Sequence, residues 1–229
     1  MFTAGPAIWA ADSRDPYFSS TTLLLNFNEG AGATAWTDKS SLARAVTRHG
    51  AAVGSTAHVL DGASSLQCTG GPSCGVDEAT SAGSLLPGDF TCEGWFYLTS
   101  APSVSMTLYN LNCTTASKEF SVYITAAGKL AANLRQYSNG DTILGATTIS
   151  ASAWHHFALV RSGTAVTLYL DGVSQGTSSS SLTHGDSRFD FIGTNWTVDS
   201  LTGWIDAVRV TKVARYTATF TPPTSFPES

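Results

Sequence analysis

Hydrophobic and polar residues alternate with a period of two along most of the chain, and no stretch has the i, i+3, i+4 spacing of an amphipathic helix. This alternation predicts strands over residues 23–27, 90–97, 106–111, 120–125, 129–135, 156–161, 166–170, 173–176, 189–192 and 203–211. Short strands separated by turn residues are typical of an all-β protein in which two antiparallel sheets form a sandwich or jelly roll.

The strongest local signal is a predicted hairpin. Residues 166–170 and 173–176 are joined by Asp171 and Gly172. Asp-Gly readily supplies the positive φ that a type I′ turn requires at both central positions, so we expect a tight antiparallel turn here.

The two ends of the chain differ from its middle. Residues 1–20 show no alternation and are predicted to form an arm, residues 21–220 form the sandwich domain, and residues 221–229 form a Pro-rich tail. Because proline cannot donate a backbone hydrogen bond, we expect the tail to run extended along the surface. We expect both ends to be ordered by a partner and not by the sandwich.

Composition narrows the function classes. Hydrophobic residues make up 42% of the chain and charged residues 13%, with a net charge of −5. Because Lys and Arg are fewer than Asp and Glu, nucleic-acid binding is not expected. The longest apolar runs, such as 23–25, are far too short to cross a membrane, so no membrane insertion is expected.

A series of short motifs resembles the laminin-G-like, concanavalin A-like jelly roll. They occur in this order: Leu24–Phe27, Asp38–Ser41, Asp61-Gly62, Asp89–Trp95, Trp154–Arg161, Leu168–Gly172 and Gly203–Val210. The resemblance covers roughly residues 21–223 and implies the same fold.

A narrower resemblance lies at the ends of the domain. Asp15–Phe18 and Ala214–Pro223 are similar to laminin-G-like modules of tailed-phage structural proteins. This implies a non-enzymatic structural or adhesive protein on the exterior of a phage particle, as a head decoration, head fibre or tail adhesin assembled in the host cytoplasm. Its implied partners are other virion proteins and further copies of itself, with a trimer as one arrangement.

Two other functions stay open: an adhesin that binds host surface glycans, and an enzyme that cleaves polysaccharide. A glycosidase needs two carboxylates beside the scissile bond. Glu93 has no acidic partner on its strand face, and Asp186, which shares parity with Asp190, follows a turn glycine. His155 and His156 are adjacent and point to opposite faces of a strand. No Gly-x-Ser-x-Gly sequence marks a nucleophilic serine, although spacing alone does not exclude a Ser–His–Asp triad. We therefore expect no enzymatic activity.

The expected ligand-binding residues are aromatic and amide side chains in loops, where a flat apolar ring is surrounded by polar groups. Asn195 and Trp196 form one such pair, and Tyr137 is the other candidate. Loop packing or a subunit contact is an equally good explanation of these residues. Three tryptophans in or near the strands are expected in the core: Trp36, Trp95 and Trp154.

Asp206 is the candidate metal ligand. It shares strand parity with Trp204, Val208 and Val210, which predicts that its carboxylate points inward. A buried carboxylate needs a cation or hydrogen-bond donors. A structural calcium would suit its oxygen ligands, whereas backbone amides or an arginine are the favoured alternative. The residue after it, Ala207, stands where the family often has an acid, which weakens the metal interpretation. No other cofactor is expected.

Cys68 and Cys74 flank a five-residue Thr-Gly-Gly-Pro-Ser segment that is short enough for a local disulfide. The first residues of the chain lack the basic and apolar regions of a signal peptide. Free thiols in a protein assembled in the cytoplasm are therefore an equal alternative.

Overall fold

The computed structural model describes residues 14–71, 73–79, 88–113, 118–136, 139–179, 187–195 and 199–229. This part of the chain holds a short 3-10 turn, Phe18–Ser20, and fifteen strands. The strands are β1 (Thr21–Leu25), β2 (Val46–His49), β3 (Val53–Ser55), β4 (Ser65–Thr69), β5 (Gly75–Ala79), β6 (Phe90–Tyr97), β7 (Met106–Cys113), β8 (Lys118–Ile124), β9 (Lys129–Gln136), β10 (Asn139–Thr148), β11 (Trp154–Ser162), β12 (Ala165–Leu170), β13 (Val173–Ser179), β14 (Ser187–Ile192) and β15 (Thr202–Thr211). Within these residues, no helix has the length and apolarity to span a membrane.

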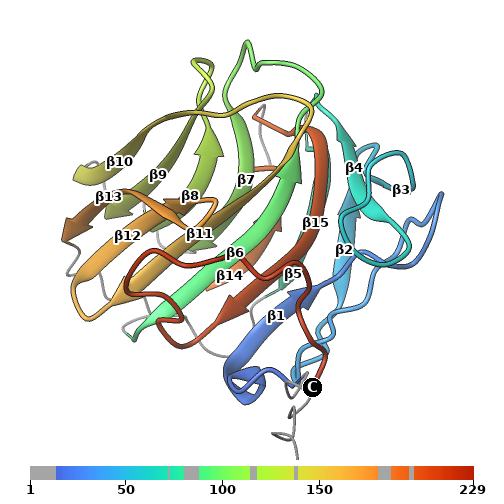
Figure 1. Cartoon of the computed structure of the whole chain (residues 1–229). Coiled ribbons are helices and arrows are strands. Elements are labelled where there is room, and N and C mark those ends of the chain that lie inside the picture. The colour runs from blue at the N-terminus through green and yellow to red at the C-terminus, as the bar shows by residue number, and fades with distance from the viewer. Residues whose placement is uncertain are drawn as a thin grey trace, which may run out of the picture.

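The strands form two antiparallel sheets that face each other, as Figure 1 shows. The eight-stranded sheet has the order β13-β12-β11-β6-β15-β4-β3, and β1 also pairs with β15. The seven-stranded sheet has the order β10-β9-β8-β7-β14-β5-β2. The predicted all-β jelly-roll sandwich is thus confirmed.

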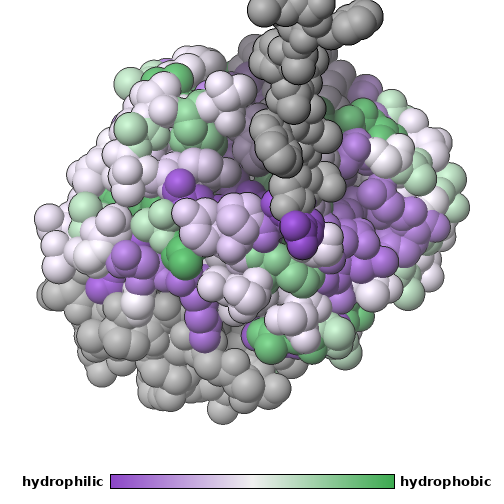
Figure 2. Space-filling view, turned by 60° about the horizontal axis from the view of Figure 1, so that its bottom comes forward, coloured by the Kyte–Doolittle hydropathy of each residue, from purple (hydrophilic) through white to green (hydrophobic). Residues whose placement is uncertain are grey.

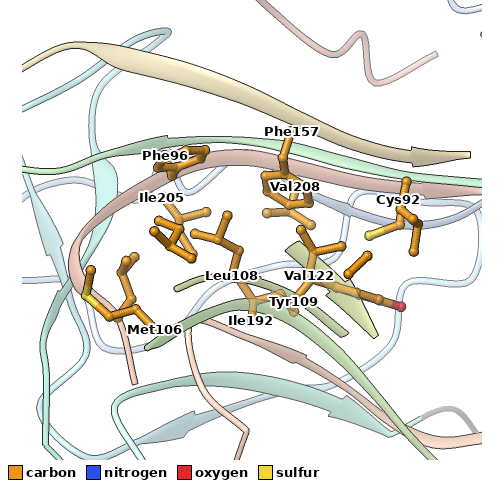
Figure 3. Packing of buried hydrophobic residues seen from close by; sticks show 14 of the residues in the cluster. Cys92, Phe96, Met106, Leu108, Tyr109, Val122, Phe157, Ile192, Ile205 and Val208 are labelled. Atoms are coloured by element: carbon orange, nitrogen blue, oxygen red, sulfur yellow. The ribbon is translucent and has the colours of Figure 1, made fainter. Parts of the chain in front are cut away.

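One continuous core fills the space between the sheets. On β6 the side chains of Phe90, Cys92 and Phe96 are buried in this core, as the alternation predicts. Figure 3 shows Phe96 of the eight-stranded sheet on one side of the core, with Leu108 and Ile192 of the seven-stranded sheet on the other. Full burial of side chains of this size contributes about 1.5–3 kcal/mol each to stability.

A β-bulge interrupts β15. Ala207 has a φ of 55°, and the register with β6 shifts between Asp206 and Val208. The extra residue reverses which parity faces the core. Val208 therefore points inward, whereas Trp204 and Asp206 lie on the outer side of the sheet, across from residues of β6. The prediction that Asp206 points inward was wrong for this reason.

The predicted hairpin is confirmed. β12 pairs with β13 through a turn in which Asp171 has a φ of 51° and Gly172 a φ of 76°. The turn also touches the C-terminal segment, since the Phe220 amide donates to the Gly172 carbonyl at 3.1 Å.

The C-terminal tail crosses the outer face of the eight-stranded sheet, where it is red in Figure 1. Phe226 is buried against Leu24 and Ala207. The Asp15 amide donates to the carbonyl of Ser229 at 2.8 Å, so the described part of the arm meets the end of the tail. The expectation that a partner and not the sandwich orders these ends was wrong for residues 14–20 and 221–229, because the sandwich itself packs against them.

On the face at the bottom of Figure 1, the surface of the described residues is largely polar. Figure 2, which views the molecule from the bottom of Figure 1, shows hydrophilic and weakly polar residues with only small, scattered hydrophobic patches.

Candidate functional site

Three aromatic side chains form a row across the outer face of the eight-stranded sheet. Tyr97 of β6 lies opposite Trp154 of β11 on one side and opposite Trp204 of β15 on the other. Its neighbour Phe96 lies in the core, so alternation directs Tyr97 outward, and its cross-strand partners share that face. We call these three residues, together with His58, the aromatic row.

The rings of the aromatic row contact one another. The Tyr97 ring centroid lies 5.6 Å from that of Trp154 and 6.0 Å from that of Trp204. His58, from the loop between β3 and β4, stacks on Tyr97 at 4.0 Å and meets Trp204 at 4.4 Å with nearly perpendicular planes. All four side chains are half-buried. Tilted and edge-to-face contacts of this kind hold the rings in defined orientations, so this surface is preformed.

Uncharged polar groups border the aromatic row. The Trp204 indole donates to the Ser55 hydroxyl at 3.2 Å. Gln67 of β4 is the next cross-strand neighbour of Trp204, and Thr202 and Thr69 face each other two residues further along the same strands. Apolar rings with nearby hydroxyl and amide groups suit a ligand that has both apolar faces and hydroxyls.

The sequence prediction of ligand-binding loops is only partly within the described residues. Trp196 and Tyr137 lie outside them. Asn195 follows β14, and its side-chain amide donates to the Asp199 carboxylate at 3.1 Å. Trp36 is in the core as predicted, but Trp154 is on the outer face, so its core assignment was wrong. Trp95 packs on a small cluster beneath the tail.

Asp206 is held by a loop next to the aromatic row. Its Oδ2 accepts hydrogen bonds from the amides of Leu60 at 2.8 Å and Asp61 at 3.2 Å, while Oδ1 has no partner. Burial raises the pKa of Asp206 to about 6. Within the part of the chain that the structure describes, no three His, Cys, Asp or Glu side chains are grouped to hold a metal ion. The calcium site at Asp206 stays a prediction, tested by melting curves with and without a chelator.

A buried ionic network ties both ends of the chain to the sheet. Arg209 of β15 contacts Glu93 of β6 at 2.7 Å and Asp15 of the arm at 2.9 Å. Arg215 of the tail contacts the same Asp15 oxygen at 2.7 Å. We call Asp15, Glu93, Arg209 and Arg215 the terminal clasp.

Further groups complete the hydrogen bonding of Glu93. The Tyr216 hydroxyl donates to its Oε2 at 2.8 Å, and His156 Nε2 lies 3.3 Å from the same oxygen. Burial raises the pKa of Glu93, but the charge of Arg209 and the hydrogen bond from His156 outweigh burial and lower the pKa to about 2. Glu93 is therefore an ionised structural carboxylate.

The structure does bring two acids together, which sequence reasoning missed. Glu78 of β5 and Asp190 of β14 are direct cross-strand partners. Both are buried, with 0% and 4% of the residue exposed. Arg44 lies 3.3 Å from Glu78, and the Tyr109 hydroxyl donates to Asp190. Burial, followed by the charge of Asp190, raises the pKa of Glu78 to about 9, and burial raises the pKa of Asp190 to about 6.

A Ser–His–Asp arrangement also occurs, at the end of the β12–β13 hairpin. His155 Nδ1 lies 2.7 Å from Asp171 Oδ2, and its Nε2 lies 2.9 Å from the Ser150 hydroxyl. The same Nε2 lies 3.0 Å from the Ser150 carbonyl. The hydrogen bond with Asp171 raises the pKa of His155. A protonated imidazole that donates to both neighbours fits this geometry, and in that state His155 is not a base.

Several solved structures of similar shape are botulinum neurotoxin domains. Botulinum neurotoxin type C, which depends on interaction with two ganglioside molecules to enter cells, is 12% identical with a TM-score of 0.65, over 86% of this chain and 49% of that one. The binding domain of botulinum neurotoxin DC gives a TM-score of 0.65 in complex with SialylT and 0.66 in complex with rat synaptotagmin II, at 14% identity in both and with the same coverage. The chain thus spans about half the length of these structures, and the likeness extends to the fold alone.

The sequence itself matches a family. No curated protein matches it. A family model described as the concanavalin A-like lectin/glucanases superfamily, of laminin-G type, matches residues 75–219, which is more than half of the chain. That segment runs from β5 through β15 and so includes most strands of both sheets. The chain therefore belongs to the laminin-G type of the concanavalin A-like lectin/glucanases superfamily.

Proposed function

We propose that this protein is a non-enzymatic adhesive module that binds glycans through the aromatic row. The observation that carries the proposal is the position of Trp154, Tyr97 and Trp204 side by side on an outer sheet face, half-buried and bordered by uncharged polar groups. Sugar rings offer apolar C–H faces for stacking and hydroxyls for hydrogen bonds, and this surface offers both kinds of contact.

The tail of the chain covers other aromatic side chains on the same face. The Trp95 indole donates to the Pro223 carbonyl at 3.0 Å, and Phe220 packs on His156 and Tyr169. The aromatic side chains beneath the tail are therefore occupied by contacts with the tail itself. Those of the aromatic row keep part of their surface in solvent.

The structurally similar neurotoxin domains support the proposal that the ligand is a glycan. Botulinum neurotoxin type C interacts with two ganglioside molecules, and the binding domain of botulinum neurotoxin DC has been solved in complex with SialylT. Their sandwich is thus compatible with glycan recognition, and we extend that use to this chain as part of the proposal.

A binding role without catalysis agrees with the two arrangements that resemble catalytic groups. Glu78 and Asp190 are buried between the sheets, where a glycosidic bond does not reach them. The His155 imidazole that lies beside the Ser150 hydroxyl also contacts the Ser150 backbone carbonyl. We expect no labelling of Ser150 by a fluorophosphonate probe and no release of reducing ends from host polysaccharide. Labelling abolished by Ser150→Ala would contradict this part of the proposal.

The direct test is a glycan array with the wild-type protein, Trp204→Ala and Tyr17→Ala. Tyr17 is a matched control, because it is an aromatic side chain that is 43% exposed and lies outside the aromatic row. Truncation of an aromatic anchor costs about 2 kcal/mol or more, so we expect Trp204→Ala to lose at least about tenfold in affinity. Equal binding by all three proteins, or no binding by any, would refute the glycan proposal.

We also infer that the module is carried on the exterior of a phage particle, with an architectural role as the second candidate function. The two segments that resemble phage modules, Asp15–Phe18 and Ala214–Pro223, meet in the terminal clasp through Asp15 and Arg215. Asp15 thus lies beside the tail, which suits attachment through one side of the domain. Labelled antibodies on intact particles, together with light scattering of the purified protein, test this. A strict monomer that is absent from particles contradicts it.

A further inference from the structure

Cys68 and Cys74 lie where the chain passes from one sheet to the other. Cys68 is in β4 of the eight-stranded sheet, and Cys74 immediately precedes β5 of the seven-stranded sheet. Both are free and buried in the core, with 2% and 1% exposed. The structure therefore has the free-thiol alternative, without the disulfide. A bond between them would connect the two sheets covalently.

Both cysteines adjoin Gly193. A Cβ atom added at Gly193 would lie 3.0 Å from the Cys68 sulfur and 3.5 Å from the Cys74 carbonyl oxygen, so the absence of a side chain there leaves room for the Cys68 thiol beside Cys74. Hydrogen-bond donors around a sulfur favour its thiolate, which is the attacking species in disulfide exchange.

The electrostatics assign different roles to the two cysteines. The hydrogen bond from Cys68, followed by those from Thr69 and Ala51, lowers the pKa of Cys74 to about 6 despite burial. The same contact and burial raise the pKa of Cys68. Cys74 is thus the thiolate of the pair at neutral pH, and Cys68 supplies the second thiol.

We propose that Cys68 and Cys74 form an oxidisable dithiol whose disulfide connects the two sheets. With a low-molecular-weight disulfide such as oxidised glutathione, the Cys74 thiolate attacks one sulfur and releases one glutathione thiolate. The Cys68 sulfur then attacks Cys74 Sγ in the mixed disulfide, releases the second glutathione and passes on its proton. The protein loses two electrons and the oxidant gains them, and two thiols replace the oxidant's disulfide.

The bond would also fix the base of the loop between β14 and β15. The Cys74 amide donates to the Ser200 hydroxyl at 2.9 Å, and the Ser200 hydroxyl in turn donates to the Thr194 hydroxyl at 3.1 Å. The Gly70 amide donates to the Leu201 carbonyl at 2.8 Å. The oxidised pair would thus hold Thr194, Ser200 and Leu201, at the start and end of this loop, more firmly than the dithiol does.

The test treats the full-length protein with oxidised glutathione or with dithiothreitol, in buffer and in urea. Remaining thiols are then alkylated and peptides are mapped by mass spectrometry. We expect a peptide that links Cys68 to Cys74, slow formation in buffer because both sulfurs are buried, and faster formation in urea. Closure of this short loop is expected to raise the melting temperature by about 5 °C.

Single substitutions separate the two roles. In Cys68→Ser, we expect Cys74 to stop at the mixed disulfide with glutathione, whereas Cys74→Ser leaves Cys68 alkylatable. Cys92→Ala, a third buried cysteine in the middle of β6, is the control and should still form the link. If both thiols of the wild-type protein stay alkylatable in buffer and in urea, or each retains its own glutathione, the proposal is wrong. Peptide mapping of the wild-type protein decides this even if a variant fails to fold.

Discussion

Glu93 and Arg209 face outward from the eight-stranded sheet, yet both are buried, because the arm and the tail lie over them. Burial of a single charge is costly, and this pair is tolerated because its oxygen and nitrogen atoms are matched by Asp15 and Tyr216. At the residue scale, the sequence predicted neither contact. Arg209 and Tyr216, which bond Glu93, are more than a hundred positions away from it, and no local sequence pattern reports such a contact.

Glu93→Gln is expected to destabilise the protein by about 3–5 kcal/mol, because it leaves Arg209 buried with one carboxylate fewer. Urea unfolding at neutral pH measures this. Glu228→Gln is the matched control. Its carboxylate is half-exposed and pairs with Lys39 at 3.9 Å, so its loss should cost about 1 kcal/mol or less. Equal stability of Glu93→Gln and the control would show that the terminal clasp contributes little.

The acids of the interior predict how stability changes with pH. The folded state raises the pKa of Glu78 from 4.5 to about 9, so its contribution is complete below pH 4.5 and is lost as the pH rises toward 9. Glu93 has the opposite sign, with a contribution that is complete above pH 4.5 and lost as the pH falls toward 2. Glu78→Gln should flatten the alkaline side of a melting-temperature profile and leave the acid side unchanged. An alkaline decline identical to that of the wild-type protein would contradict the assignment.

At the scale of elements, alternation predicted the long strands and the Asp-Gly hairpin well, because each has one face in the core. It missed β2, β3, β4, β5 and β10. Several of these are short or have both faces partly covered, so apolar residues do not alternate in them. The bulge at Ala207 carries no turn residue in the sequence, which is why the orientation of Trp204 and Asp206 was predicted wrongly.

The β12–β13 hairpin provides a test at this scale. In Gly172→Ala, the new Cβ would lie 1.9 Å from the Phe220 carbonyl oxygen at a φ of 76°, so either the turn or the tail must move. Gly163→Ala is the control, because Gly163 has a φ of 60° and no atom within 4 Å of the added Cβ. We expect a loss of about 1 kcal/mol from left-handed strain in the control and clearly more in Gly172→Ala, measured by thermal unfolding. Equal losses would show that the tail does not pack on this turn.

At the scale of the whole molecule, the fold could be predicted from the sequence, whereas the candidate site could not. Tyr97, Trp154 and Trp204 become neighbours only through the pairing of β6 with β11 and β15, and a single sequence does not state strand register. The loops chosen from the sequence were selected for aromatic residues near turns. The structure instead places the aromatic side chains on the outer face of the sheet, where β6 ends and β11 and β15 begin, and they keep part of their surface in solvent.

The central claim is that the aromatic row contacts a glycan, and hydroxyl-radical footprinting with mass spectrometry tests it most directly. Oxidation of each aromatic side chain is compared with and without the polysaccharide that the array identifies. We predict that the bound glycan protects Trp154, Tyr97 and Trp204, while Tyr17 is oxidised equally in both states. Protection confined to Tyr123 and Phe189 of the seven-stranded sheet, with the aromatic row unchanged, would contradict the account.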